Sequence, residues 1–165
     1  MSTVDLNLSM QSIPSFFGAP IGDIEDLSEK KIAVAGLFCD HFSEGEPGAR
    51  YAARQLRYAS LPLLANGLKI STPSNIIDVG ELNVFPIEPI KTQSILKEQS
   101  YRIKQTGATL LALGGDYSLI PALVSGQLKA NPDCHLKFIR ISRNLDAAEI
   151  LDTQKNPMNR SSATR

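Results

Sequence analysis

Two short and almost wholly apolar runs set the strongest limit on how this chain can fold. They span residues 32–38 and 109–113, and each has the length of a strand. A strand that is apolar at nearly every position is typical of a parallel sheet covered by helices on both faces. Both runs fall well short of the ~20 residues that a membrane-spanning helix needs. Because segments with helical spacing alternate with these strands, we predict a soluble α/β protein with a mostly parallel sheet.

The helix expected over residues 50–60 has two opposite sides. At helical spacing, one side carries small and apolar residues, which are Ala52, Leu56 and Ala59. The opposite side carries three arginines, Arg50, Arg54 and Arg57. Such a stripe could bind phosphate or carboxylate, but a solvated helix face is the favoured interpretation.

The remaining elements follow from spacing and from turn residues. We expect strands at residues 75–79 and 136–141 and helices at residues 91–106 and 118–131. In the first of these helices Glu98 and Arg102 are spaced to form an ion pair across one turn. Ser118 is placed to cap the second helix, which tolerates Pro121 in its first turn and ends at Asn131.

Length, charge and cysteine content limit the class of protein. A chain of 165 residues with 42% hydrophobic content can bury one core, so we expect an N-terminal arm at 1–30, one domain at 31–150 and a flexible polar tail at 151–165. The 17 basic and 17 acidic residues cancel, which argues against nucleic acid or membranes as partners. Two distant cysteines and the lack of a secretion-like opening segment predict a cytoplasmic protein.

Ligands of parallel α/β sheets bind beyond the carboxyl ends of the strands. That rule selects three loops, at residues 39–48, 114–118 and 142–147. In the second, "GGDYS", the residues Gly114 and Gly115 permit the backbone shape and Asp116 can accept hydrogen bonds from loop amides. We favour a structural role for this turn over a catalytic one.

The histidines and the first cysteine are weak candidates for a site. Cys39, Asp40 and His41 are consecutive, so their side chains cannot all bind one ion from a strand end. Cys39 is better interpreted as a small core residue and His135 as a surface residue.

The order of motifs resembles one known family. The segments "FCD", "EPGARYAARQLRYAS", "IIDVGEL" and "LLALGGDYS" follow one another as in the amino-terminal half of the ureohydrolases, the arginase and agmatinase superfamily. The likeness covers residues 16–146, about half of a family member of usual length. It implies a truncated arginase-like fold, a three-layer sandwich. The sequence departs from the family motifs at several positions. Phe38 and Cys39 replace the usual proline and aromatic residue, Ala52 and Ala53 replace glycine and proline, and Glu81 replaces aspartate.

The resemblance also implies a chemistry that this sequence does not support. Family members use two manganese ions to activate a water that attacks a guanidinium carbon and releases urea. The positions that match the family's ligands in this chain are Tyr117, Ser142, Asn144 and Asp146, and the later carboxylate segment is absent. Only Asp146 keeps its type, and a neutral phenol is a poor manganese ligand. We therefore expect neither a metal nor another cofactor.

Several functions remain open at this point. The first is a catalytically inactive ureohydrolase-like protein that acts as a binding or regulatory subunit, with a protein partner, a second copy of itself, or a guanidinium or amino-acid ligand. The alternative is a manganese-dependent guanidino hydrolase completed by a partner chain; a third is a degenerating product without a selected role. A half-length sheet also has an uncovered edge. Lys137 and Arg140 suggest that the last strand is adapted to that place.

Overall fold

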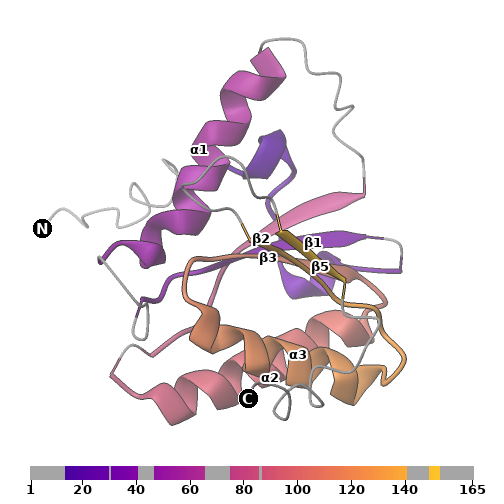
Figure 1. Ribbon diagram of the computed structural model, residues 1–165. Coiled ribbons are helices and arrows are strands. Elements are labelled where there is room, and N and C mark those ends of the chain that lie inside the picture. The colour runs from indigo at the N-terminus through magenta and orange to yellow at the C-terminus, as the bar shows by residue number, and fades with distance from the viewer. Residues whose placement is uncertain are drawn as a thin grey trace, which may run out of the picture.

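A computed structural model describes residues 14–29, 31–40, 47–65, 75–85 and 87–140, together with the backbone of 149–152 (Figure 1). Its centre is a parallel sheet in the order β2-β1-β3, formed by β1 (Ile32–Leu37), β2 (Ile76–Leu82) and β3 (Thr109–Leu113). Helix α1 (Ala52–Ala65) covers one face, whereas α2 (Pro89–Gln105) and α3 (Ile120–Ala130) cover the other. The predicted α/β class, with its mostly parallel sheet and three layers, is confirmed. None of the helices described is long and apolar enough to cross a membrane.

Shorter elements connect these layers. They are 3-10 helices at Phe16–Gly18, Ile24–Asp26, Ala49–Tyr51 and Tyr117–Leu119, and the strands β4 (Lys137–Arg140) and β5 (Glu149–Asp152). β5 crosses the boundary expected at residue 150, and the division of the chain into arm, domain and tail stays a prediction.

Strand β1 is the centre of the core, as its apolar run predicts. Ala33, Ala35 and Leu37 belong to the larger apolar cluster, which the residues of α2 and α3 share. Val34 belongs to a smaller cluster with Ala53 of α1. Both faces of β1 are therefore buried, since alternate side chains of a strand point to opposite faces.

Strand β3 is less covered than its sequence predicts. Leu113 is buried, but Thr109 is exposed and Leu111 is 38% exposed. In the described pairings, β3 bonds to β1 on one side and to no strand on the other. The edge position explains the exposure, because the outer side of such a strand has no neighbour.

The last predicted strand does not join this sheet, which corrects our expectation of where the edge lies. β4 pairs antiparallel with β5 in a separate two-stranded sheet. Its side chains alternate between exposed Lys137 and Ile139 and partly buried Phe138. This alternation suits a strand covered on one face only. The side chain of Arg140 lies outside the described residues.

The expected solvated face of α1 is wrong for one of its arginines. The buried residues of the helix are Ala53, Arg57 and Ser60, whereas Ala59, which we expected inside, is exposed. Arg57 is only 2% exposed. Helical spacing alone did not predict the burial of Arg57. A positively charged side chain is buried in a core only where carboxylates pair with it, and the spacing within one helix does not show those partners.

Arg57 forms ion pairs with two carboxylates. Its Nε and Nη2 donate to the two oxygens of Asp78 at 2.8 Å each, and its Nη1 donates to Oε1 of Glu81 at 2.6 Å. Nη2 also reaches the carbonyl oxygen of Gly80 at 3.0 Å. Burial opposes the charged form, but the hydrogen bonds and attraction of Asp78 and Glu81 outweigh it and raise the pKa of Arg57. The guanidinium thus joins α1 to β2.

The N-terminal arm is tied to the same carboxylate. The amide of Phe16 donates to Oδ2 of Asp78 at 2.9 Å. Ile21 forms a parallel bridge with Asp78, whose own amide donates to the carbonyl of Pro20 at 2.9 Å. Residues 20–22 therefore cover the outer edge of β2 at Asp78, and the extent of the arm expected at residues 1–30 stays a prediction.

The predicted ion pair between Glu98 and Arg102 does not form. Oε2 of Glu98 lies 3.6 Å from Nζ of Lys129 in α3. Nη2 of Arg102 lies 3.0 Å from Oε1 of Glu25 in the N-terminal segment. Neighbouring elements thus supply partners that the spacing within one helix cannot reveal. Such exposed pairs contribute about 0–1 kcal/mol each, so tertiary placement easily redirects them.

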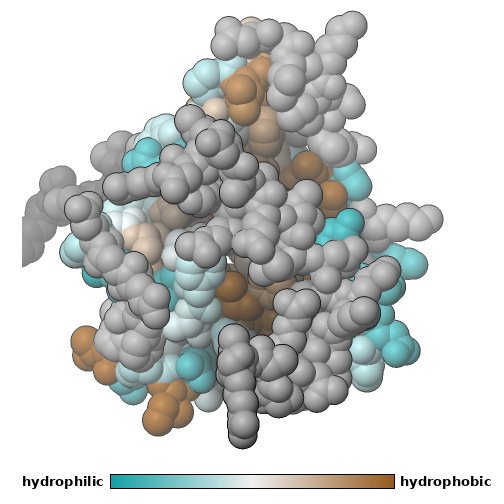
Figure 2. All heavy atoms as spheres, in the orientation of Figure 1, coloured by the Kyte–Doolittle hydropathy of each residue, from teal (hydrophilic) through white to brown (hydrophobic). Residues whose placement is uncertain are grey.

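The start of α2 projects from the body of the molecule. Ile87 is 90% exposed and Ile90 is 85% exposed. Apolar atoms lie at the surface at the lower left of Figure 2, where α2 begins in Figure 1. The packing side of α2 begins further along the helix, at Thr92 and Leu96, which are buried.

Candidate functional site

The second of the three selected loops lies at the carboxyl ends of β1 and β3, close to residues that flank the first loop. A Cβ atom at Gly115 would lie 2.8 Å from the carbonyl oxygen of Ala49, and one at Gly114 would lie 3.0 Å from Leu37. Neither glycine has a positive φ. Their role is therefore close packing against Leu37 and Ala49, the residues on either side of the first loop, and not the unusual backbone shape that we expected. The third loop, residues 142–147, lies outside the described residues.

Asp116 caps the turn that follows β3. Its Oδ1 accepts a hydrogen bond from the Ser118 amide at 2.9 Å, and the residue is 4% exposed. This confirms that Asp116 bonds a loop amide. The prediction that Ser118 caps the helix is wrong, because its buried Oγ has no hydrogen-bond partner within the described part of the chain. The 3-10 turn at Tyr117–Leu119 moves the cap two residues earlier than the helical spacing indicated.

Substitutions at the two residues should separate these roles. We expect Asp116→Ala to lower the free energy of unfolding by about 1 kcal/mol, since it leaves an amide without its acceptor. Ser118→Ala should be neutral or slightly stabilising, because it removes a buried hydroxyl that lacks a partner. Urea denaturation followed by circular dichroism measures both. A larger loss for Ser118→Ala than for Asp116→Ala would contradict this assignment.

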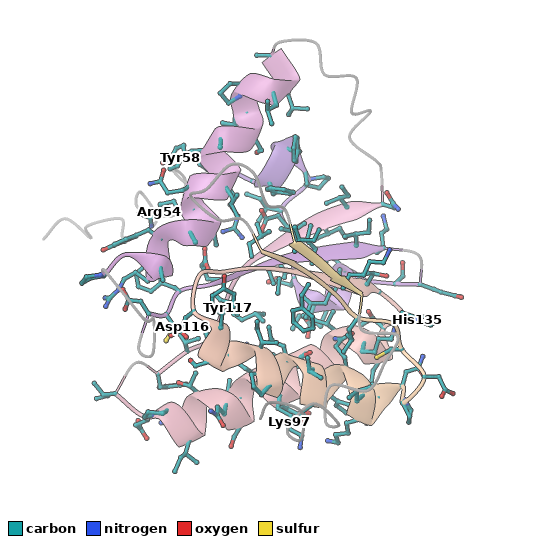
Figure 3. All side chains as sticks on the ribbon, viewed as in Figure 1. Arg54, Tyr58, Lys97, Asp116, Tyr117 and His135 are labelled. Atoms are coloured by element: carbon teal, nitrogen blue, oxygen red, sulfur yellow. The ribbon has the colours of Figure 1, made fainter. Side chains whose placement is uncertain are left out.

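Tyr117 stands at the start of this turn, next to Asp116 (Figure 3). Its side chain is 58% exposed. The other three positions that match family ligands, Ser142, Asn144 and Asp146, lie outside the described residues. The structure thus places one of the four expected positions at the carboxyl edge of the sheet, and it is the one that carries a phenol.

An ion pair at the end of β1 was missed by sequence reasoning. The Nε of Arg50 donates to Oδ2 of Asp40 at 2.7 Å and Nη2 donates to Oδ1 at 2.5 Å. The Gly48 amide also donates to Asp40, at 3.2 Å. The hydrogen bonds from Arg50 lower the pKa of Asp40, and those to Asp40 raise the pKa of Arg50. An acid after the first strand and an arginine opening the next helix were the available signal.

Aromatic rings flank this pair. Phe38 and Tyr51 pack edge to face with their centroids 5.6 Å apart. The Arg50 guanidinium carbon lies 6.0 Å from the centre of the Phe38 ring. Arg50 is therefore held by a carboxylate and an aromatic face together.

The structure places two of the weaker candidates, Cys39 and His135, as the sequence predicts. Cys39 is buried at 4% exposure, so its interpretation as a core residue is confirmed, and no disulfide joins it to Cys134. His135 is exposed and lies at the opposite end of the sheet from Tyr117 (Figure 3), which confirms a surface role. His41 lies outside the described residues.

The described donors at this edge do not fit a pair of manganese ions. Asp40 is already neutralised by Arg50, whose positive charge would repel a cation. The Asp116 carboxylate is buried and bonded to an amide, and Tyr117 offers only a phenol. Within the described ranges, no three His, Cys, Asp or Glu side chains gather as a metal site.

Comparison with known proteins identifies the class. The arginase family model matches residues 30–153, so the chain belongs to the arginase family. A solved structure of proclavaminate amidino hydrolase from Streptomyces clavuligerus is similar, with a TM-score of 0.59 and 24% identity over 72% of this chain and 40% of that one. A hypothetical agmatinase from Burkholderia thailandensis gives a TM-score of 0.62 and 23% identity over 70% and 37%. This chain thus spans about two fifths of the solved structures that it matches.

Proposed function

We propose that this chain is a member of the arginase family that does not hydrolyse guanidino compounds by itself and acts as a binding subunit in the cytoplasm. The observation that carries the proposal is the phenol of Tyr117 at the one described ligand position. The family motif there supplies an imidazole, which binds manganese readily, whereas a neutral phenol does not.

The ion pair between Asp40 and Arg50 adds support. It places a fixed guanidinium at the carboxyl edge of β1, beside the turn that contains Tyr117. A positive charge near a two-cation site would raise the energy of both bound ions. The ion pair therefore supports a protein that keeps the family fold and its surfaces but not the metal chemistry.

An assay of urea release tests the proposal. Purified chain is incubated with added manganese and, in turn, with arginine, agmatine and guanidinobutyrate, beside an active agmatinase in the same buffer. We expect no urea above the buffer blank, and less than stoichiometric manganese after dialysis. Measurable turnover by the lone chain would refute the proposal.

The same assay separates the alternative of a hydrolase completed by a partner chain. If a partner co-purifies and the complex releases urea, Asp146→Ala should abolish that activity under the alternative. Under our proposal, Asp146→Ala leaves the activity of such a complex unchanged, because the partner would then carry its own complete site.

A further inference from the structure

Residues 15–22, here called the strap, are bound to the rest of the molecule through backbone hydrogen bonds that end on buried groups. The Phe16 amide donates to Oδ2 of Asp78 at 2.9 Å, and the Phe17 amide donates to Oγ of Ser60 at 2.8 Å. Asp78 lies on β2 and Ser60 on α1, and each is only 2% exposed. The first half of the strap thus joins a strand and a helix of the body.

The second half of the strap pairs with β2 at a single residue. The Asp78 amide donates to the carbonyl oxygen of Pro20 at 2.9 Å, and the Gly22 amide donates to the carbonyl oxygen of Asp78 at 3.2 Å. The backbone and the carboxylate of Asp78 therefore hold both halves of the strap. Because the bonds share this residue, loss of one weakens the positioning of the others, and we expect the strap to bind and release as one unit.

The side chains of this segment contribute little to its attachment. Among residues 14–26, Ala19 alone is buried, whereas Ile21 is 73% exposed. Phe17 is partly buried and has φ 51° and ψ 32°, in the left-handed region that is unfavourable for residues other than glycine. A segment with little buried apolar surface and a strained residue belongs to the least stable part of a fold.

We propose that the strap is a conformational device that releases from α1 and β2 while the rest of the fold stays intact, and that its release uncovers the ion pair of Arg57 and Asp78. The Oδ2 atom that accepts from the Phe16 amide also accepts from Nε of Arg57, at 2.8 Å. Water that replaces the strap therefore reaches the carboxylate of the pair directly. The closed and released forms differ in the solvation of a buried charge pair, which couples the strap to the contact between α1 and β2. This inference goes beyond the proposed function and does not depend on it.

Amide hydrogen exchange of the full chain, followed by NMR at each residue, tests the release. The amides of Phe16, Phe17 and Gly22 should show one common opening constant, at least about tenfold larger than that of the amides of β1. Low concentrations of urea should barely change this constant, because the release exposes little surface. They should raise the opening of β1 steeply, because its amides become free only when the core unfolds.

Ser60→Ala removes the acceptor of the Phe17 amide. It should raise the opening constant of the strap about tenfold, since the amide loses a buried partner. Ser100→Ala is the matched control, because it also removes a buried serine hydroxyl, one that donates to the carbonyl oxygen of Leu123 at 2.7 Å. It should weaken the contact of α2 with α3 and leave the opening of the strap unchanged.

A pair of variants at Phe17 keeps the test decisive if loss of the Ser60 hydroxyl disturbs α1. Phe17→Val and Phe17→Asn both remove the ring, which packs edge to face on Phe16 with centroids 4.6 Å apart. Asparagine adopts the left-handed region readily, whereas a β-branched side chain does not. The valine variant should therefore open about fivefold more than the asparagine variant.

Labelling of arginine side chains with phenylglyoxal, mapped by mass spectrometry, reports whether the ion pair is uncovered. The rate at Arg57 should rise about tenfold in Ser60→Ala, in step with the opening of the strap. The rate at Arg102, whose side chain is 52% exposed, should stay the same. Strap amides that exchange only together with those of β1, or at separate rates, would overturn the inference. Equal opening of the two Phe17 variants, or unchanged labelling of Arg57 in a strap that opens, would overturn it as well.

Discussion

Replacing Arg57 with alanine is expected to lower the free energy of unfolding by about 3–5 kcal/mol. The substitution leaves the buried carboxylate of Asp78 without its bidentate partner and removes the bond to Glu81. An uncompensated buried charge costs more than the attraction of the intact pair contributes. Equilibrium unfolding in urea, followed by circular dichroism, measures the change.

Arg54 is the matched control on the same helix. It is only partly buried, and Arg54→Ala should change the free energy of unfolding by about 0.5 kcal/mol or less, in the range of surface substitutions. Combining Arg57→Met with Asp78→Asn should recover part of the loss, because no unpaired guanidinium or Asp78 charge then remains. Equal effects of Arg54→Ala and Arg57→Ala would show that the buried pair contributes little.

The second large effect is expected at Gly126, where α3 crosses α2. A Cβ atom there would lie 2.3 Å from the carbonyl oxygen of Lys97 and 2.8 Å from the Tyr101 amide nitrogen, and both are backbone atoms. Alanine favours a helix over glycine by about 1 kcal/mol. The collision should outweigh this gain, so we expect Gly126→Ala to destabilise the protein by a net of about 1–3 kcal/mol.

Hydrogen bonds across the same crossing make it hard for the helices to separate. Ser100 donates to the carbonyl of Leu123 at 2.7 Å, and the side-chain amide of Gln127 donates to Ser100. Ser125→Ala, at an exposed position one residue earlier, is the control for helix propensity and should be neutral or slightly stabilising. Thermal unfolding of the two variants compares them, and a stabilised Gly126→Ala variant would show that the helices move apart at little cost.

The predicted elements were mostly correct because their signals are local. The strands at β1 and β3, the helices α2 and α3, and the stop at Asn131 follow from apolar runs, helical spacing and turn residues. The burial of Cys39 also follows from its place directly after an apolar strand.

The candidate site was only partly predictable. The turn that contains Asp116 and Tyr117 could be found from its motif, since its residues are adjacent in sequence. The pair between Asp40 and Arg50 was missed, because the two residues are ten positions apart in sequence, and the spacing of residues within one helix or strand does not bring such positions together.

The sequence by itself determined the layers of this protein and its family, because strand length, helical period and motif order are properties of neighbouring residues. Only the tertiary structure decided that Arg57 is buried, that Asp116 rather than Ser118 caps the turn, and that β3 is the last strand on its side of the sheet among the described residues. Each of these depends on groups that become neighbours when distant segments pack together. The free energy of a buried charge, a cap or a strand edge is set by those neighbours, which the spacing of residues along the chain does not specify.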